Sequence, residues 1–209
     1  TNLVSIPVAN DRMLDELRNN ILKAGESTGL DLDPVWDCQV LVAVNERSEL
    51  SRKAVNEYLQ DALNPNPKVG NLRFRAKDKI VCLKNGFYES VMDVDLDAED
   101  IETNERGEVY VANGELGSVE KIINESQLVV RLDNPSRVIR VPLSKKKSDS
   151  DDDSKGGATN WDLGYALSVH KAQGSEWPIV FVLLDDYPGA RMVCDRAWLY
   201  TATSRAKQK

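Results

Sequence analysis

The sequence has few of the residues that mark metal centres, disulfide frameworks and membrane segments. It contains one histidine, His170, and three cysteines, Cys38, Cys82 and Cys194, which lie far apart within apolar stretches. Cysteines in such surroundings are typical of buried thiols in a reducing compartment, so we expect a cytoplasmic protein. No apolar run approaches the ~20 residues of a membrane span. The N-terminal residues also lack the zones of a signal peptide, so we expect no membrane partner.

The chain also lacks an excess of positive charge, since its net charge is −7. The acidic residues are unevenly distributed, however. Residues 93–108 and 149–153 together hold 12 of the 34 acidic residues and one of the 27 basic residues, which leaves the rest of the chain at +4. Nucleic acid therefore stays open as a partner. Residues 146–155 contain no apolar side chain, and we expect them to form a flexible acidic connector.

Apolar patterning predicts an α/β organisation at both ends of the chain. Helical spacing marks residues 12–23, and unbroken apolar runs of strand length occur at 38–44 and 178–184. Such runs are typical of strands buried on both faces of a parallel sheet. The first strand is followed by a predicted helix that Ser48 caps and that prolines end at 64–67; the second precedes a helix predicted at 195–207.

The middle of the chain has a different character, because short β-rich runs alternate there with turn residues. The predicted strands are 79–83, 108–112, 116–123, 127–132 and 137–143. This pattern indicates a small antiparallel barrel of about five strands. We therefore expect a barrel over residues 69–145, inserted into a discontinuous α/β domain of residues 1–68 and 156–209.

A short polar segment directly precedes the second apolar run, in "HKAQGSEWPIVFVLL". Gly174 allows a ligand to approach the backbone closely, and Gln173 and Glu176 flank it with groups that bind a phosphate, a ribose or a metal-bound water. Loops at the ends of strands are where α/β proteins usually bind ligands. An ordinary polar turn before a strand is the alternative interpretation.

The second candidate segment is "WLYTATSRAK", near the end of the chain. Arg205 carries a planar, permanently charged fork that suits a γ-phosphate. Thr201 places a hydroxyl nearby. Taken by itself, the arginine is equally consistent with a solvated surface residue.

In this order and spacing, the segments resemble superfamily 1 DNA helicases, most closely the RecD-type group that includes the exonuclease V alpha subunit. "YALSVHKAQGSEWPIVFVLL" is similar to their motif V, "RAWLYTATSRAK" to motif VI and "CQVLVAVNERSE" to motif IV. "YVANGELGSVEKI" is similar to a step in the small SH3-like barrel that these enzymes insert into their second RecA-like domain. The resemblance covers roughly residues 35–209 and implies an α/β, RecA-like second helicase domain with such an inserted barrel.

The resemblance also implies roles for individual residues. The implied ATP-binding residues are Gln173, Gly174, Glu176 and Arg205, of which Arg205 is the catalytic residue at the γ-phosphate. The implied residues facing single-stranded DNA are Ser168, His170, Lys171 and Thr201. A motif IV arginine is usual in the family, but Asn45 occupies its place here and Arg47 is displaced, which leaves a second arginine contact open.

The P-loop pattern G-x-x-x-x-G-K-[ST] occurs nowhere, and no acidic pair suited to Mg²⁺ follows a strand before motif IV. In the helicases that the chain resembles, these parts belong to the first RecA-like domain. We therefore expect a C-terminal part of an ATP-dependent DNA helicase with 5′–3′ translocation, inactive alone. It would work with the protein's own N-terminal P-loop domain, which holds Mg²⁺, and with nuclease or helicase subunits. The alternative is a stand-alone, non-enzymatic module that binds nucleic acid or protein through the barrel.

Overall fold

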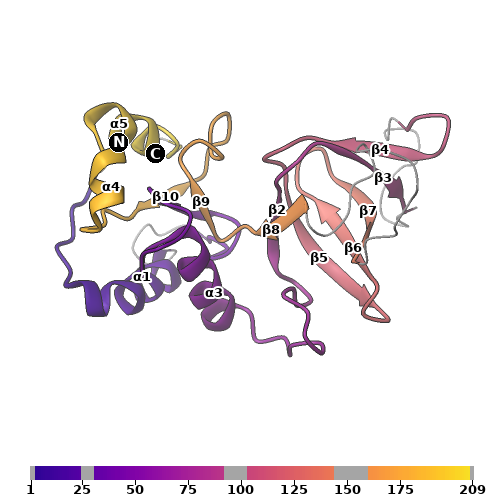
Figure 1. The fold of residues 1–209 in the computed structure, drawn as a ribbon, viewed down its shortest axis with the longest axis horizontal. Helices are drawn as coiled ribbons and strands as arrows, with labels where there is room; N and C mark the ends of the chain where they lie inside the picture. The colour runs from indigo at the N-terminus through magenta and orange to yellow at the C-terminus, as the bar shows by residue number, and fades with distance from the viewer. Residues whose placement is uncertain (1–2, 25–30, 92–102, 144–159, 208–209) are drawn as a thin grey trace. The chain divides into compact units, whose positions relative to one another are not determined.

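The structure, a computed structural model, describes residues 3–24, 31–91, 103–143 and 160–207. It divides into two units (Figure 1). The α/β unit comprises Thr1–Leu63 and Tyr165–Lys209, and the sheet unit comprises Asn64–Gly164. The α/β unit is thus discontinuous in sequence. The connector predicted at 146–155 lies outside the described residues.

The α/β unit is built on a three-stranded parallel sheet in the order β10-β1-β9. The central strand β1 (Cys38–Val42) is buried along its whole length, as its unbroken apolar sequence predicts. It pairs with β9 (Ala166–Ser168) on one side and with β10 (Ile179–Val182) on the other. Every residue of β10 is only half-buried, because β10 is an edge strand.

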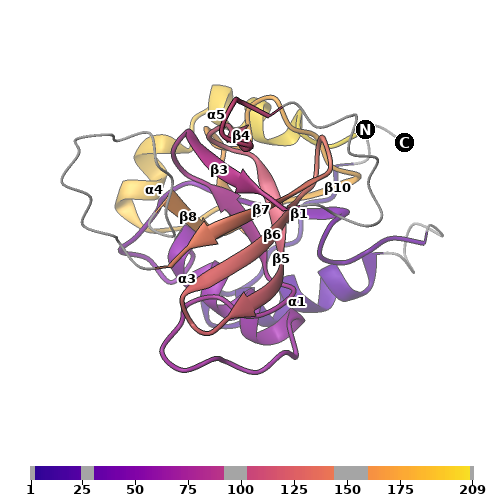
Figure 2. The same cartoon turned by 90° about the vertical axis from the view of Figure 1, so that its right-hand side faces the viewer.

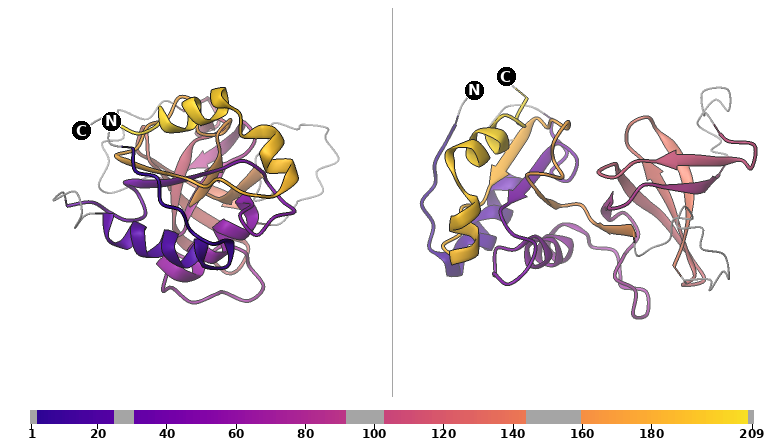
Figure 3. Two further views of the ribbon diagram at one scale, coloured as in Figure 1. Left: turned by 90° about the vertical axis from the view of Figure 1, so that its left-hand side faces the viewer. Right: turned by 45° about the horizontal axis from the view of Figure 1, so that its top comes forward.

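Helices cover both faces of this parallel sheet (Figures 1 and 3). A single 3₁₀ turn, η1 (Asn10–Arg12), leads into α1 (Met13–Leu22), and α1 lies on the same face as α3 (Arg52–Leu63). The opposite face carries α4 (Pro188–Val193) and α5 (Arg196–Thr203). The apolar stripes of α1 and α3 bury Leu17, Ile21, Val55 and Leu59.

Two details of this unit differ from the sequence prediction. Ser48 does not cap α3, because a turn separates them: the Ser48 carbonyl accepts the Ser51 amide (3.1 Å), and the helix begins only at Arg52. Ser51 takes the capping position instead, with its hydroxyl 3.4 Å from the Ala54 amide. The short elements β9 and α4 were not predicted, because three and six residues are too few for a periodic signal.

The sheet unit is one antiparallel sheet of seven strands in the order β4-β3-β7-β6-β5-β2-β8. The strands are β2 (Lys79–Cys82), β3 (Gly86–Ser90), β4 (Glu108–Val111), β5 (Leu116–Ile123), β6 (Gln127–Leu132), β7 (Arg137–Pro142) and β8 (Trp161–Leu163). Figure 2 shows the sheet curling into a half-barrel. A register shift in β5, between Val119 and Lys121, is the kind of bulge that strengthens such curvature.

Alternation of buried and half-exposed residues defines the inner face of this half-barrel. It is clearest in β6, where Leu128, Val130 and Leu132 are buried and their neighbours are not. Tyr88 and Trp161 meet on the same inner face in an edge-to-face contact, with ring centroids 5.7 Å apart. The Trp161 indole N–H also donates to the Tyr88 hydroxyl (3.0 Å), so β3 and β8 are joined through their side chains.

The count of strands corrects the prediction of about five, because β3 and β8 belong to the same sheet. The five strands predicted from sequence are present as β2, β4, β5, β6 and β7. β8 was assigned to the α/β part of the chain, yet Ile80, Val81 and Cys82 of β2 pair with it. Because β8 is only three residues long and is followed by a glycine, its sequence has no periodic pattern that could assign it to either unit.

The three cysteines, all within the described residues, form no disulfide. Cys38 and Cys82 are buried as predicted, whereas Cys194 is only partly buried at the end of α4. Burial is the main cause that raises the pKa of the Cys194 thiol, and Asp185 and Asp195 raise it further. Among the described residues, no helix combines the length and apolar character required to span a membrane.

Candidate functional site

The loop between β9 and β10 runs from the carboxyl ends of the parallel strands, here called the carboxyl edge of the sheet, to their amino ends, the amino edge. Ser168, at the end of β9, pairs with Val42 of the central strand, while Ile179, at the start of β10, pairs with Cys38. Four strand residues separate these two levels, which corresponds to about 13 Å along the strand direction. Residues 169–178, named here the crossing loop, therefore connect the carboxyl edge of the sheet to its amino edge.

The first half of the crossing loop is a compact turn. The Ser168 carbonyl accepts the amides of Lys171 (2.9 Å) and Ala172 (3.1 Å), and the His170 carbonyl accepts the amide of Gln173 (3.4 Å). Ala172 is fully buried and anchors this turn to the unit. His170 is exposed beside it, at the carboxyl edge of the sheet. The turn thus presents the histidine and its neighbour Lys171 beyond the end of β9.

Gly174 adopts a positive φ of 85°, which favours glycine. A Cβ atom placed there would meet nothing within 4 Å, so the space beside this backbone is open. Gln173 and Glu176 are both exposed around the same position. This combination of open backbone and polar side chains can accommodate a polar ligand that approaches closely.

Beyond this open step, the crossing loop is fastened to the end of α5. The Trp177 amide donates to the Arg205 carbonyl (3.0 Å), and the Lys207 amide donates to the Trp177 carbonyl (2.7 Å). These two bonds form a parallel bridge between Trp177 and Ala206. Trp177 is also buried, so its side chain reinforces the connection. Two segments that are distant in sequence are therefore joined at this point.

Helix α5 positions Arg205. Asp195 caps the helix, accepting the Trp198 amide at 2.7 Å, and Trp198 and Ala202 are its buried residues. The Arg205 side chain is half-buried and folds back along the helix end, donating from Nε to the Thr201 carbonyl (3.3 Å) and from Nη2 to the Ser204 hydroxyl (3.0 Å).

Thr201 lies one turn before Arg205, and its hydroxyl donates to the Ala197 carbonyl within the helix (2.8 Å). The structure thus groups Thr201 with Arg205, whereas Ser168, His170 and Lys171 lie together at the other end of the crossing loop. Gln173 and Gly174 belong to the turn that also holds His170, since the Ser175 amide donates to the Ala172 carbonyl (3.2 Å), whereas Glu176 directly precedes the bridge at Trp177.

Side chains at the carboxyl edge of the sheet hold two loops in place. The Asn45 side-chain oxygen accepts the Arg52 Nε–H (3.0 Å), and the Ser48 hydroxyl donates to the Asp185 carboxylate. Arg47, the displaced arginine of the motif IV comparison, is exposed with a positive φ of 70°. Sequence reasoning missed both contacts: Ser48 and Asp185 come from separate loops, and the bond between Asn45 and Arg52 depends on how the loop between β1 and α3 folds back on itself.

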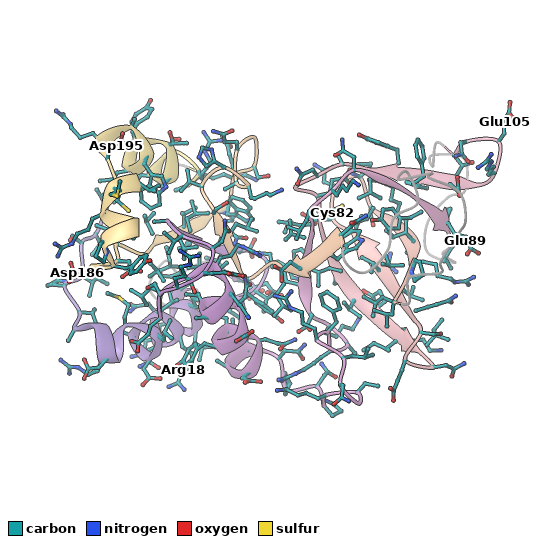
Figure 4. The ribbon with its side chains drawn as sticks, viewed as in Figure 1. Arg18, Cys82, Glu89, Glu105, Asp186 and Asp195 are labelled. Atoms are coloured by element: carbon teal, nitrogen blue, oxygen red, sulfur yellow. The ribbon has the colours of Figure 1, made fainter. Side chains whose placement is uncertain are left out.

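The acidic residues that the structure describes in the α/β unit do not form a metal centre. Asp185 accepts hydrogen bonds from Ser48 and from the Tyr187 amide (2.9 Å), and Asp186 pairs with Arg191 at 2.8 Å. Figure 4 places Asp186 ahead of α4 and Asp195 ahead of α5. Within the described ranges, no group of three or more His, Cys, Asp or Glu residues is arranged to hold a metal ion. The residues described here therefore do not fit Mg²⁺.

Comparison with known families gives a match at the C-terminal end of the sequence. Residues 163–209, which contain the crossing loop and α5, match the UvrD-like helicase C-terminal domain family. This match begins at the end of β8 and covers β9, β10, α4 and α5.

Solved structures of Pif1 helicases are similar to the chain at low identity. The Bacteroides Pif1 helicase in complex with ADP-AlF3 and ssDNA is 15% identical, with 99% of this chain and 49% of that chain covered and a TM-score of 0.47. The Candida albicans Pif1 helicase is 13% identical, with 94% and 51% covered and a TM-score of 0.47. Bacteroides Pif1 bound to ssDNA is 15% identical, with 93% of this chain and 46% of that chain covered and a TM-score of 0.44. The chain spans about half the length of these proteins. Its C-terminal part, residues 163–209, is thus similar to the C-terminal domain of UvrD-like helicases.

Proposed function

We propose that this chain is the second RecA-like domain, with an inserted SH3-like barrel, of an ATP-dependent DNA helicase of the RecD type. The RecA-like domain corresponds to the unit Thr1–Leu63 and Tyr165–Lys209, and the barrel lies within the unit Asn64–Gly164, which includes β8. A P-loop domain of the same protein completes the ATP cleft and holds Mg²⁺. In this proposal the ligands are ATP and single-stranded DNA, and the chain alone does not turn over ATP.

The observation that carries the proposal is the bridge between Trp177 and Ala206. A motor that couples ATP hydrolysis to movement on DNA needs one element that touches both ligands. The crossing loop has its proposed DNA-facing residues, Ser168, His170 and Lys171, at one end of its path. Its other end is hydrogen-bonded to the peptide of Arg205. The family match of residues 163–209 supports the same assignment.

The proposed chemistry is charge stabilisation by a positioned side chain. Arg205 would reach the γ-phosphate and stabilise the charge that spreads over its oxygens during phosphoryl transfer. Gln173 and Glu176 would bind polar groups of the nucleotide beside the open backbone at Gly174. ATP brings Mg²⁺ to neutralise its phosphates, and the ligands for that ion would come from the P-loop domain.

An ATPase assay tests the proposal. The full-length protein should hydrolyse ATP faster when single-stranded DNA is present, whereas the 209-residue chain should show no turnover. Turnover by the chain alone would contradict the proposal. Nanomolar binding of the chain alone to DNA at physiological salt would favour a stand-alone binding module, because only one side of the DNA groove is present here.

The RecD assignment adds a direction, 5′–3′, that can be tested separately. The full-length protein should unwind duplexes that carry a 5′ single-stranded tail and leave those with a 3′ tail intact. Unwinding from the 3′ tail would retain the helicase function and remove the RecD assignment. Association with nuclease subunits is a further part of this assignment, and co-purification of the full-length protein tests it.

A further inference from the structure

Arg52 is held at the carboxyl end of the central strand. It is the first residue of α3, and its Nε–H donates to the Asn45 side-chain oxygen (3.0 Å). Its backbone amide donates to the Val44 carbonyl (2.9 Å), two residues beyond the end of β1. Both the main chain and the guanidinium of Arg52 are therefore tied to the loop that leaves β1.

Hydrogen bonds from Asn56 show where Arg52 lies relative to β9. The Asn56 side chain accepts the Ala166 amide and donates to the Ala166 carbonyl, each at 2.9 Å, which fixes α3 against β9. Arg52 is one turn earlier in the helix, and four helical residues rise about 6 Å. The two strand residues from Ala166 to Ser168 cover about the same distance.

The direction of α3 relative to β9 decides whether Arg52 lies toward the carboxyl edge or the amino edge of the sheet. Val44, bonded to Arg52, follows Val42, which pairs with Ser168. Ala166, bonded to Asn56, pairs with Val40, further back along β1. Helix α3 thus runs opposite to β9, and Arg52 stands level with Ser168. The guanidinium belongs to the same edge of the sheet as His170 and Lys171, which follow Ser168.

We propose that Arg52 binds a backbone phosphate of single-stranded DNA, with Asn45 as the residue that positions it. A guanidinium presents paired N–H groups that match phosphate oxygens, and the bond to Asn45 fixes its plane in advance. The inference rests on the proposed function, since it takes the DNA strand to lie along this edge beside Ser168, His170 and Lys171. It adds a DNA contact from α3, outside the segment that matches the helicase family.

The phosphate is assigned to DNA and not to the nucleotide because of the geometry of the crossing loop. Of the proposed nucleotide-binding residues, Arg205 lies at the bridge with Trp177, toward the opposite edge from Ser168, whereas Gln173 shares the turn that holds His170. The assignment therefore rests on Arg205, the residue proposed to contact the γ-phosphate. The two levels are about 13 Å apart along the strands, which is beyond a direct contact. Competition at constant ionic strength tests this assignment: excess ATP should displace no more DNA from the wild type than from Arg52→Ala.

Fluorescence anisotropy with a labelled oligonucleotide tests the proposal on the 209-residue chain, at about 50 mM salt, where phosphate contacts are strongest. Arg52→Ala should weaken binding about 3- to 10-fold and reduce the salt slope by about 0.7. The loss should be equal for oligo-dT and mixed sequences, because phosphate contacts carry no base specificity. Asn45→Ala should weaken binding less and have no additional effect when combined with Arg52→Ala.

Arg191→Ala is the matched control, since it also removes one positive charge but lies on α4, paired with Asp186. Its affinity should stay within about twofold of the wild type. If Lys171→Ala weakens binding and folded Arg52→Ala does not, the inference fails while the proposed function stands. If the wild-type chain and the full-length protein both fail to bind DNA, the proposed function fails first. Displacement of DNA from the wild type but not from Arg52→Ala by ATP would instead assign Arg52 to the nucleotide.

Discussion

The two units of the chain use their polar side chains in opposite ways. In the sheet unit, charged residues of strands and turns pair with one another: Arg137 with Glu115 at 2.6 Å, Arg140 with Glu89 at 2.8 Å and Lys77 with Glu120 at 2.6 Å. In the α/β unit, polar residues gather on loops beyond strand ends, and many bond to backbone or to neighbouring loops. This difference locates the candidate site in the α/β unit.

Glu120 illustrates the pairing in the sheet unit. Burial by itself would raise the pKa of this carboxyl, but hydrogen bonds from Lys77 and Ser118 outweigh burial and lower the pKa. A similar arrangement joins Glu115 to the Ala112 amide (2.7 Å) and to Arg137, which closes the turn between β4 and β5. These charges hold turns and strands together, so their substitution should affect the stability of the sheet unit and not ligand binding.

The largest expected effect tests whether Arg205 in the α/β unit takes part in ATP hydrolysis. In the full-length protein, Arg205→Ala should lower kcat for DNA-stimulated ATP hydrolysis by at least ~10², because arginine fingers contribute about 10³–10⁵. Arg205→Lys should behave similarly, since it keeps the charge but loses the planar fork. DNA binding should be largely retained in both variants.

The control for this prediction is Arg140→Ala in the sheet unit, which breaks an exposed pair with Glu89. It should shift stability by less than about 1 kcal/mol and leave kcat unchanged. A folded Arg205→Ala protein with near-normal ATPase activity would show that Arg205 is an ordinary surface residue. The comparison between the two units would then lose its central residue.

Sequence reasoning predicted long, regular elements well and short ones poorly. The runs that became β1, β10, α1, α3 and α5 were all predicted within a few residues of their observed bounds. β3, β8, β9 and α4 were missed, since short segments in which burial depends on distant partners have no period of their own. Tyr88 and Trp161, for example, are buried against each other across 73 residues of sequence.

The residues of the candidate site stay a prediction from sequence, and the structure adds the connections among them. Gly174 was singled out for close backbone approach, and its positive φ and open surroundings leave room for such an approach. The bridge from Trp177 to Ala206 and the bond between Asn45 and Arg52 left no signal. The bridge depends on the topology that brings the segment before β10 beside the end of α5, and the bond between Asn45 and Arg52 depends on the path of the loop between β1 and α3.

The next largest effect concerns the core of the sheet unit. Burial raises the pKa of Tyr88 to about 12, and the nearby Cys82 thiol contributes to the rise. Because the folded pKa lies above the unfolded value of 10.0, the hydroxyl stabilises the fold fully below pH 10. That contribution, about 2–3 kcal/mol, should be lost as the pH rises from about 10 to 12.

Urea denaturation at a series of pH values, followed by tryptophan fluorescence, measures this loss. Tyr88→Phe should be less stable than the wild type at neutral pH by about 1–3 kcal/mol, because the Trp161 N–H loses its partner. Above pH 10 the difference should shrink, since the variant has no hydroxyl to ionise. A difference that stays constant up to pH 12 would contradict the assigned role of Tyr88.

Two glycines, one in each unit, should lose about the same stability when replaced by alanine, so their effects on ATP binding can be compared. Gly174 in the crossing loop and Gly107 in the sheet unit both have positive φ, 85° and 71°, and neither would bring a Cβ within 4 Å of another atom. Gly174→Ala and Gly107→Ala should therefore each cost about 1–2 kcal/mol of stability. In the full-length protein, only Gly174→Ala should raise KM for ATP, and equal KM values would argue against a ligand at Gly174.

The smallest expected effect tests whether the bridge between the crossing loop and α5 matters for catalysis. Lys207→Pro removes the amide that donates to the Trp177 carbonyl, while the Trp177 amide still bonds to Arg205. Proline favours an extended conformation in the residue before it, which suits Ala206 in its parallel bridge. Half of the bridge is thus lost with little expected strain.

The loss of one hydrogen bond changes stability by about 1 kcal/mol, so Arg205 should be less well positioned in a fraction of molecules. We expect kcat for DNA-stimulated ATP hydrolysis by the full-length protein to fall about two- to fivefold. The Kd for single-stranded DNA should not change, because Ser168, His170 and Lys171 lie at the other end of the crossing loop. Lys207→Ala keeps the amide and loses only the exposed ammonium group, so it should match the wild type. If Lys207→Ala lowers kcat as much as Lys207→Pro, the side chain and not the bridge is responsible.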